Sequence, residues 1–474
     1  MKLIQILGFA AVASAFVIPD EEVSNQLVIE SENKQDSFLD KLPSKDGIFS
    51  DLEESFSNVF ETSKHVFDDA IASAIEGGKQ ASKKFECMKS MTAFDAGSWL
   101  DSPIEMDDED DEPIDVYENH PPHHKPGKGH HGHHGHHKPN LTVYELIAKS
   151  KYTTKLAELI NEDEDLVKLL NGTTANFTIF APTDKAFAKI PKHAHKPSKE
   201  IIKKILSYHV SPEFYPAGKV LITRTIPTLL KEEALGSEPL PQRLATNIGL
   251  RGLTVNFYSR IIAVDIFGTN GVIHGVDSLI VPPPTAAEIV SLLPGEFSTL
   301  TLGLDKTGLL DAINNTEHAG GTLFAPSNFA FRKLGPKINA FLFSRFGEKY
   351  LKALLKYHIV GGHTLYSDAY YQAEEQAEGI PKGYFHVDLP TLLEDRSLAV
   401  DVSRYGRLIT IKINGFSKVA VPDGIAKDGV IHVISSVLIP PKKVDGVTQQ
   451  WQGEEITEED LMERLEPYMR PELK

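Results

Sequence analysis

Residues 178–191 read TIFAPTDKAFAKIP, and residues 322–335 repeat the pattern as TLFAPSNFAFRKLG. Placing Phe180 on Phe324 aligns the two stretches, in which alternating apolar and small polar residues meet a proline and then an Ala-Phe pair. The alternation is typical of a strand with one buried face, and proline ends such a strand because it cannot donate the next ladder hydrogen bond. The stretch therefore predicts a strand, a proline turn and a short helix whose phenylalanine packs on the sheet.

Two further blocks repeat in the same order. In each copy, a stripe of apolar residues at helical spacing ends in a Tyr-His pair: Tyr208-His209 and Tyr357-His358. Residues 270–283, NGVIHGVDSLIVPP, match residues 428–441, DGVIHVISSVLIPP, and their β-branched residues before prolines indicate a strand. Three paired blocks in one order indicate two copies of one domain, each large enough to hold its own core.

Hydroxyl side chains mark the expected starts of helices. Thr183 and Ser327 follow the prolines of the two repeated strands, where a side-chain oxygen can accept a hydrogen bond from the backbone of a new helix. Ser198 stands in front of the first apolar stripe in the same way. Each copy is therefore expected to combine strands with short capped helices.

The three repeated blocks resemble the fasciclin domain. The resemblance covers residues 140–442 as two tandem copies, and it rests on the F-A-P-[T/S]-x-x-A-F block, the Tyr-His pair and the G-V-I-H block. It implies an α+β fold with two fasciclin-like domains, at 140–284 and 285–442, each a β-sandwich or wedge with packed helices. It also implies a non-catalytic role in cell-surface adhesion or in matrix and protein interaction.

The same resemblance points to contact residues and partners. Animal members of the family use the Tyr-His region in receptor contacts, which makes four residues of this chain candidates for interaction: Tyr208, His209, Tyr357 and His358. The implied partner is an extracellular or cell-wall polymer or a protein. The likeness to microbial, especially fungal, members leaves two destinations open, a vacuole lumen and the cell wall or surface.

Charge and motifs exclude several functions. The formal net charge of −17 argues against a nucleic-acid partner, because phosphate binding requires a basic surface. The chain contains no G-x-x-x-x-G-K-[S/T] phosphate loop, no H-E-x-x-H zinc helix and no G-x-S-x-G nucleophile elbow. The single cysteine, Cys87, lies outside both repeats, where it either forms an intermolecular disulfide or stays an unpaired thiol. We therefore predict that the chain is not an enzyme and that its domains hold no cofactor.

Residues 1–15 are typical of a secretory signal, with one lysine, a short apolar run and Ala-Ser-Ala before the expected cleavage site. No later segment has the length and apolarity expected of a transmembrane helix. We therefore expect the chain in the secretory pathway, either in a vacuole lumen or secreted to the cell wall. Four N-x-[S/T] sequons are candidate glycosylation sites there: Asn140, Asn171, Asn176 and Asn314.

The segments outside the repeats differ in composition. Residues 16–100 carry apolar residues at helical spacing, so we expect an amphipathic helix whose mostly acidic polar face favours packing or pairing over membrane binding. Residues 101–139 carry nine acidic side chains between Glu105 and Glu118 and then nine of the chain's 19 histidines, with few apolar residues. Such a segment predicts a disordered linker. Residues 443–474 are expected to form an acidic tail.

The histidine tract leaves three roles open. Neutral imidazole binds zinc, copper or nickel, and the tract offers labile ligands at several positions: His130, His131, His133, His134, His136 and His137. Protonation would instead add positive charge beside the acidic run and make the linker pH-responsive. The third role is a solvated spacer. The sequence thus supports two functions, an adhesion or interaction module and a luminal, vacuolar scaffold with a metal- or pH-responsive linker.

Overall fold

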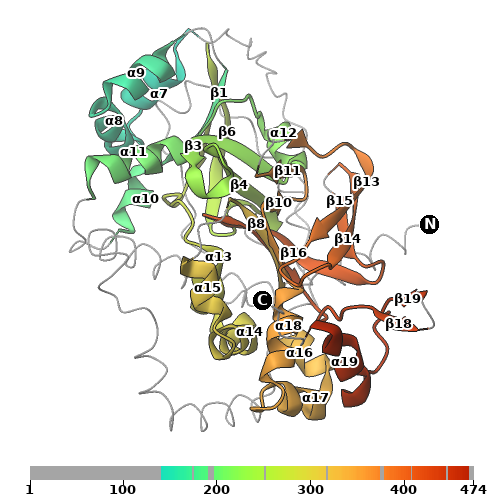
Figure 1. Ribbon diagram of the computed structural model, residues 1–474. Helices are drawn as coiled ribbons and strands as arrows, with labels where there is room; N and C mark the ends of the chain where they lie inside the picture. Colours follow the sequence, from blue (N-terminus) through green and yellow to red (C-terminus); the bar gives the residue numbers. More distant parts are fainter. Residues whose placement is uncertain are drawn as a thin grey trace, which may run out of the picture.

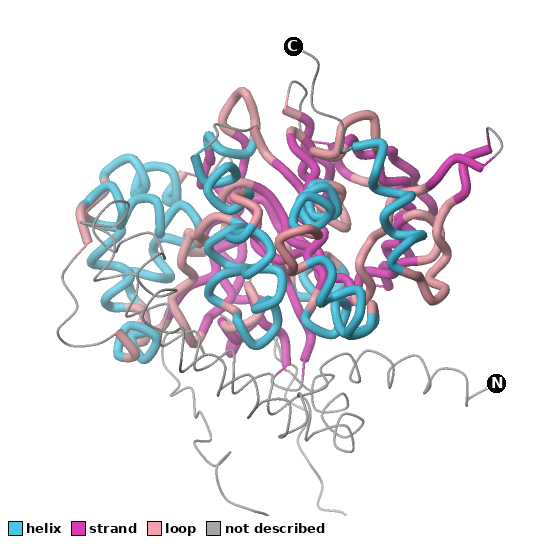
Figure 2. Tube along the Cα trace, turned by 60° about the horizontal axis from the view of Figure 1, so that its bottom comes forward, coloured by secondary structure: helices cyan, strands magenta, loops and turns pink. Residues whose placement is uncertain are grey.

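The computed structural model describes residues 140–172, 176–190, 197–249, 252–315, 319–373, 378–406, 408–444 and 447–468. The expected signal, amphipathic helix and linker, together with Cys87, lie outside the described residues. The described chain forms two domains of the expected α+β class (Figures 1 and 2). The same strand order occurs in both.

Domain 1 contains seven strands: β1 (Phe177–Pro182), β2 (Val210–Ser211), β3 (Thr225–Glu232), β4 (Leu240–Gly249), β5 (Gly252–Val255), β6 (Ser259–Gly268) and β7 (Gly271–Val276). They form a curled sheet in the order β2-β1-β7-β6-β5-β4-β3, in which β1 and β7 are parallel. Its helices are α7 (Val143–Lys149), α8 (Thr154–Asn161), α9 (Glu164–Asn171), α10 (Asp184–Ala188), α11 (Lys199–Tyr208), α12 (Ala217–Ile222) and the 3-10 turn η2 (Glu233–Leu235).

Domain 2 repeats this sheet with seven equivalent strands: β8 (Gly321–Pro326), β9 (Ile359–Gly361), β13 (Gly383–Pro390), β14 (Ser397–Tyr405), β15 (Leu408–Ile413), β16 (Ser417–Ala426) and β17 (Gly429–Ile434). Their order is β13-β14-β15-β16-β17-β8-β9, with β17 and β8 parallel. Two smaller sheets are added: β10 (His363–Leu365), β11 (Ala369–Gln372) and β12 (Glu378–Gly379), and β18 (Lys442–Val444) with β19 (Val447–Gln449).

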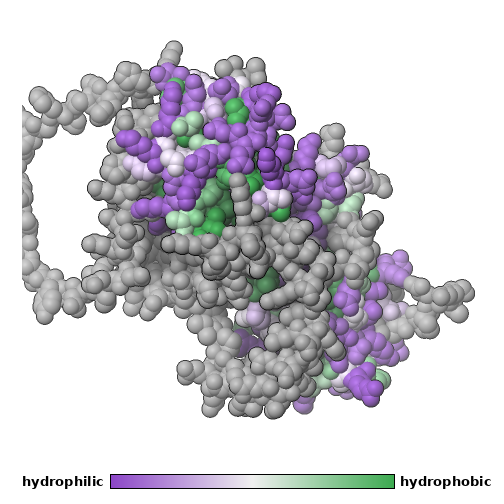
Figure 3. Space-filling model, turned by 90° about the vertical axis from the view of Figure 1, so that its left-hand side faces the viewer, coloured by the Kyte–Doolittle hydropathy of each residue, from purple (hydrophilic) through white to green (hydrophobic). Residues whose placement is uncertain are grey.

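The helices of domain 2 are α13 (Ala286–Leu292), α14 (Pro294–Lys306), α15 (Leu309–Asn315), α16 (Asn328–Lys333), α17 (Gly335–Leu342), α18 (Glu348–Lys356), α19 (Glu458–Leu465) and the 3-10 turn η3 (Glu466–Tyr468). Figure 1 shows α14 to α19 gathered at one end of the molecule and α7 to α11 beside the sheet of domain 1. Figure 3, which faces the latter helices, shows a mainly hydrophilic outer side. No described helix is both long and apolar enough to cross a bilayer.

The repeated stretch forms the strand, turn and helix that the sequence predicts. β1 and β8 each end at the repeated proline, and α10 and α16 begin two residues later. Phe180 and Phe324 are fully buried, and their ring centroids lie 5.7 Å and 5.6 Å from the imidazole rings of His274 and His432. These matching surroundings confirm that the two repeats are copies of one fold.

The predicted helix caps are confirmed in part. The Ser327 side chain accepts from the backbone N–H of Ala330 at 3.2 Å, and Ser198 accepts from Ile201 at 3.4 Å. The prediction is wrong at Thr183, whose hydroxyl makes no cap hydrogen bond although its backbone is as extended as that of Ser327. This hydroxyl is buried and finds no hydrogen-bond partner among the described residues.

The glycine of the G-V-I-H block permits a close approach of two parallel strands. A Cβ atom on Gly271 would lie 2.3 Å from the carbonyl oxygen of Phe177, and one on Gly429 would lie 2.1 Å from that of Gly321. Gly429 also has φ 153°, which L residues rarely adopt. Both copies therefore need glycine where β7 and β17 begin.

The expected acidic tail is corrected by the structure, because much of it is part of domain 2. Trp451, Leu461 and Leu465 are at most 6% exposed and belong to the domain 2 core. The ring centroid of Trp451 lies 5.0 Å from that of Phe416. Five of the seven acidic side chains of residues 447–468 remain exposed, so the segment is acidic in composition but folded.

Candidate interaction sites

The Tyr-His pairs, which the resemblance marks as contact residues, lie in the two cores. All four side chains are at most 1% exposed: Tyr208, His209, Tyr357 and His358. Each tyrosine hydroxyl accepts a hydrogen bond from an asparagine side chain in the turn after a strand, over 2.9 Å from Asn256 in domain 1 and 3.0 Å from Asn414 in domain 2. In this conformation the pairs hold helix to sheet and present no atoms to a partner.

Both histidines of these pairs are bonded at each ring nitrogen. His209 Nδ1 lies 2.8 Å from the carbonyl oxygen of Ile205, and its Nε2 accepts from the backbone N–H of Ile280 at 2.9 Å. His358 makes the equivalent two contacts in domain 2, each over 2.8 Å. A neutral imidazole with its proton on Nδ1 satisfies both partners. Burial lowers the pKa of both histidines to about 4, which favours this neutral form.

A second histidine in each domain supports a bulge in the sheet. His432 Nε2 lies 2.7 Å from the carbonyl oxygen of Leu365, and its Nδ1 accepts from the backbone N–H of Asp423 at 3.3 Å. Asp423 has φ 64° at a register shift between β16 and β17. His274 makes the same contacts at Asp265 in domain 1, and burial lowers the pKa of both histidines. These recurrent histidines therefore shape the core.

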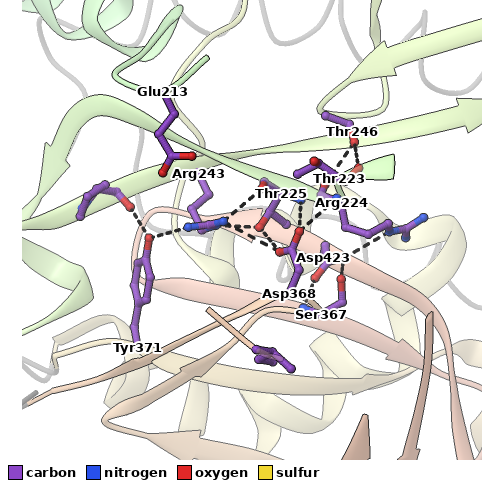
Figure 4. Close-up of polar contacts among 12 residues, drawn as sticks. Glu213, Thr223, Arg224, Thr225, Arg243, Thr246, Ser367, Asp368, Tyr371 and Asp423 are labelled. Carbon is purple, nitrogen blue, oxygen red and sulfur yellow. Dashed lines mark hydrogen bonds and ion pairs between the residues drawn. The ribbon is translucent and has the colours of Figure 1, made fainter. Parts of the chain in front are cut away.

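Buried polar side chains join the two domains (Figure 4). Asp368, in the turn between β10 and β11, is 6% exposed and faces β3 of domain 1. Its Oδ2 accepts from the backbone N–H groups of Arg224 at 3.0 Å and Thr225 at 2.9 Å, and its Oδ1 accepts from the Thr225 hydroxyl. One carboxylate of domain 2 thus satisfies three donors of domain 1.

Arg243 of β4 completes this contact from the side of domain 1. Its guanidinium donates to the hydroxyl of Thr225 at 2.6 Å, to the carbonyl of Thr225 at 3.1 Å and to the hydroxyl of Tyr371 at 3.1 Å. It also lies 3.9 Å from the Asp368 carboxylate. Burial alone lowers the pKa of an arginine, but Tyr371 and Asp368 raise the pKa of Arg243 above its ordinary value. Arg243 is therefore charged inside the junction.

A second ion pair and an apolar cluster extend the junction. Arg224 Nε lies 3.7 Å from Asp423 Oδ2, and the Gln242 side chain donates to the carbonyl of Ala426 at 3.1 Å. Two carboxylates thus face two guanidinium groups, and the buried charges balance. Apolar side chains of both domains pack around them: Leu235, Ala245, Tyr366, Ala369, Tyr371, Ile425 and Val430. The two domains therefore pack as one unit.

The sheet face that is covered in domain 1 is open in domain 2. An asparagine side chain accepts from the backbone N–H of Ala245 in domain 1 and of Ala399 in domain 2, which makes the two alanines equivalent. Their cross-strand neighbours are Thr225 and Asp388. Domain 2 buries Ala245 and Thr225 to 1% and 0% exposure, whereas Asp388 is exposed and Ala399 is partly exposed.

We call the open surface the β13–β15 face, and its side chains come from three strands: Tyr384, His386, Asp388, Ala399, Asp401, Ser403, Tyr405, Leu408, Thr410 and Lys412. Tyr384, Tyr405 and Leu408 are 64%, 70% and 73% exposed. The Tyr384 hydroxyl donates to the Asp401 carboxylate, and His386 Nδ1 lies 2.7 Å from it. These two contacts lower the pKa of Asp401. Large exposed side chains therefore lie beside polar side chains that hydrogen bonds hold in place.

A family model describes the same unit twice. The model of the fasciclin domain matches residues 151–282 and 295–440, more than half of the chain. The chain belongs to the fasciclin domain family. One match lies in domain 1 and the other in domain 2, so the resemblance carried by the repeated blocks is confirmed.

Relatives share the fasciclin domains over very different lengths. Aurofusarin biosynthesis cluster protein S of Gibberella zeae is 31% identical over 70% of this chain and 87% of its own length. Human periostin is 27% identical over 56% of this chain, and the match spans 28% of periostin. Rat stabilin-2 is 24% identical over 39% of this chain and 13% of its own length. A FAS1 domain pair from the insect cell adhesion molecule fasciclin I aligns over 60% of this chain and 96% of its own, with 21% identity and a TM-score of 0.30.

Comparison of the two repeats does not reveal the residues that join the two fasciclin domains. Arg243 lies two residues before Ala245 in domain 1, and the corresponding position before Ala399 in domain 2 is Ser397. Asp368 lies three residues after Leu365, whose carbonyl oxygen bonds His432 in domain 2. The corresponding position in domain 1, three residues after Tyr215, is Gly218. The junction residues differ because the two domains contribute different sides of one contact. A repeat comparison finds only what both copies share.

Three of the four sequon asparagines lie in the described part with exposed side chains: Asn140, Asn171 and Asn176. Asn171 accepts from the hydroxyl of Thr142 at 2.7 Å, whereas the side chain of Asn314 on α15 is not described. The histidine tract lies outside the described residues. Within those residues, no group of three or more His, Cys, Asp or Glu side chains could hold a metal ion. Glycosylation and metal binding by the tract stay predictions.

Proposed function

We propose that this fasciclin-domain chain is a non-catalytic binding protein of the secretory pathway that mediates cell-surface or cell-wall adhesion or protein interaction. One observation carries the proposal: the β13–β15 face is open, although the equivalent face of domain 1 is buried by a protein contact. Tyrosine is enriched at protein interfaces, because its ring buries apolar area while its hydroxyl finds a partner. Membership of the fasciclin domain family supports the same role.

The test measures retention of the full-length chain on immobilised cell-wall polysaccharide and on extracellular matrix protein. The Y384A/Y405A variant should weaken binding by about tenfold or more, as expected for exposed aromatic anchors. Its thermal midpoint should stay unchanged, because both rings are largely exposed. Leu169→Ser on α9, where the side chain is 43% exposed, is the matched control and should bind as the parent does. Equal retention of all three proteins would reject the β13–β15 face as the binding site.

The alternative function is a luminal, vacuolar scaffold whose linker responds to metal or pH. The nine histidines between residues 120 and 137 favour it, because neutral imidazole binds Zn²⁺, Cu²⁺ and Ni²⁺. Calorimetric titration of the full-length chain with zinc or copper should show binding that disappears when residues 120–137 are deleted. Unchanged metal uptake by the deletion variant would exclude the tract. A tagged chain delivered to the vacuole would weaken the adhesion role, and a wall-bound chain would weaken the scaffold.

A further inference from the structure

Positive charge is concentrated on three helices of domain 2. Residues 328–356, which form α16, α17 and α18, contain one acidic residue, Glu348, and seven basic ones: Arg332, Lys333, Lys337, Arg345, Lys349, Lys352 and Lys356. Six of the seven are exposed and Lys356 is partly exposed. The three helices lie together at one end of the molecule (Figure 1). These helices thus form a basic surface in a chain with a net charge of −17, and we call it the α16–α18 surface. The acidic helix α19 packs against α17 and α18 and borders this surface.

Two exposed phenylalanines interrupt this basic surface. Phe346, between α17 and α18, is 61% exposed, and Lys349 Nζ lies 5.3 Å from its ring centroid. Phe329 of α16 is 41% exposed, with Lys333 Nζ at 4.8 Å and the guanidinium of Arg332 at 5.7 Å from its ring. Exposed phenylalanine rings and basic side chains therefore lie next to one another on these helices.

Three basic side chains of this surface lack the internal partners that Lys189 and Lys203 have in domain 1. In domain 1, Lys203 of α11 lies 3.3 Å from Asp163, and Lys189 lies 3.5 Å from Asp277. Glu348 is paired with Lys306 of α14 at 3.7 Å. Arg345, Lys349 and Lys352 form no ion pair within the described part of the chain. Like charges held together in this way attract an anionic partner.

We propose that the α16–α18 surface docks on a bilayer that contains anionic phospholipids. The lysines and arginines are attracted to the headgroup phosphates, while Phe329 and Phe346 enter the interfacial region between the headgroups and the acyl chains. Long basic side chains reach the headgroups while their stems cover apolar surface. A soluble polyanion would neutralise the cations but would leave Phe346 in water, so the combination favours a bilayer.

The test is co-sedimentation of the full-length chain with vesicles of phosphatidylcholine, with and without phosphatidylserine. The parent should bind only the anionic vesicles, and high salt should release it. K349E/K352E should lower the partition coefficient by roughly 25-fold or more, because losing each basic residue near the surface costs about fivefold and the two new carboxylates are repelled by the headgroups. Phe346→Ser should lower it by roughly tenfold and should leave circular dichroism unchanged, because the ring is mostly exposed.

The matched control is K199E/K204E, which makes the same charge change at exposed positions of α11, the equivalent helix of domain 1. It should bind anionic vesicles as the parent does. An equal loss in both double variants would mean that net charge, and not this surface, drives binding. Binding to heparin that matches vesicle binding and is indifferent to Phe346→Ser would show that the surface takes a soluble polyanion. Either result, or no binding to anionic vesicles, overturns the proposal.

Discussion

His209 and His358 couple the stability of both domains to pH at the scale of single residues. Their folded pKa is lowered to about 4 by burial, against 6.5 for an exposed histidine. The unfolded chain therefore binds more protons than the folded one between these values. The stabilisation is complete above pH 6.5 and is lost as the pH falls towards 4, by roughly 3 kcal/mol per histidine. We expect H209Q/H358Q to flatten this loss in urea unfolding followed across that pH range.

Leu206→Ala supplies the control for this prediction, because it removes a buried side chain of α11 without removing a titratable group. Leu206→Ala should lower the free energy of unfolding but should leave its pH dependence as it is in the parent. If H209Q/H358Q also kept the full slope between pH 6.5 and 4, the two buried histidines would not be the groups that take up the protons.

At the scale of elements, the sequence predicts what local chemistry decides. The strand-to-helix corner follows from an alternating strand and its proline, and the Ser327 cap follows from one side chain near one N–H group. Thr183 shows the limit, because a hydroxyl side chain at the same position and with the same extended backbone makes no cap hydrogen bond there. Thr457 in front of Leu461 and Leu465 is a local signal for helix α19, but the packing of that helix on domain 2 depends on contacts far along the chain. The open β13–β15 face depends on such contacts as well.

The C-terminal helix α19 should stabilise domain 2 as a core element. Leu461 is fully buried, so Leu461→Ala should lower the free energy of unfolding by about 2–5 kcal/mol, the range for a leucine whose removal leaves a cavity. The exposed Glu459 on the same helix is the control, and Glu459→Ala should change stability by less than about 0.5 kcal/mol. Denaturant unfolding of both variants measures these two changes in the free energy of unfolding. Similar stabilities for the two would mean that α19 is a tail resting on the domain.

At the scale of the whole molecule, the two fasciclin domains are copies in fold but not in surface. Domain 1 buries its β3–β4 face under the β10–β11 turn, and domain 2 keeps the equivalent face open. The junction thus buries one of the two equivalent sheet faces, that of β3 and β4, and leaves the β13–β15 face exposed. This arrangement follows from residues at which the copies differ, chiefly Arg243 and Asp368, and comparison of the repeats cannot supply it.

Asp368→Ala tests whether the junction makes the domains one cooperative unit. The change leaves Arg243 buried without its carboxylate and leaves three donors at Arg224 and Thr225 without an acceptor, which should cost about 3–5 kcal/mol. Calorimetry should then resolve separate transitions for the two domains, and small-angle scattering should show a larger radius of gyration. Asp388→Ala removes an exposed carboxylate from the open face and should change neither. A single unshifted transition in Asp368→Ala would mean that the apolar cluster alone holds the domains together.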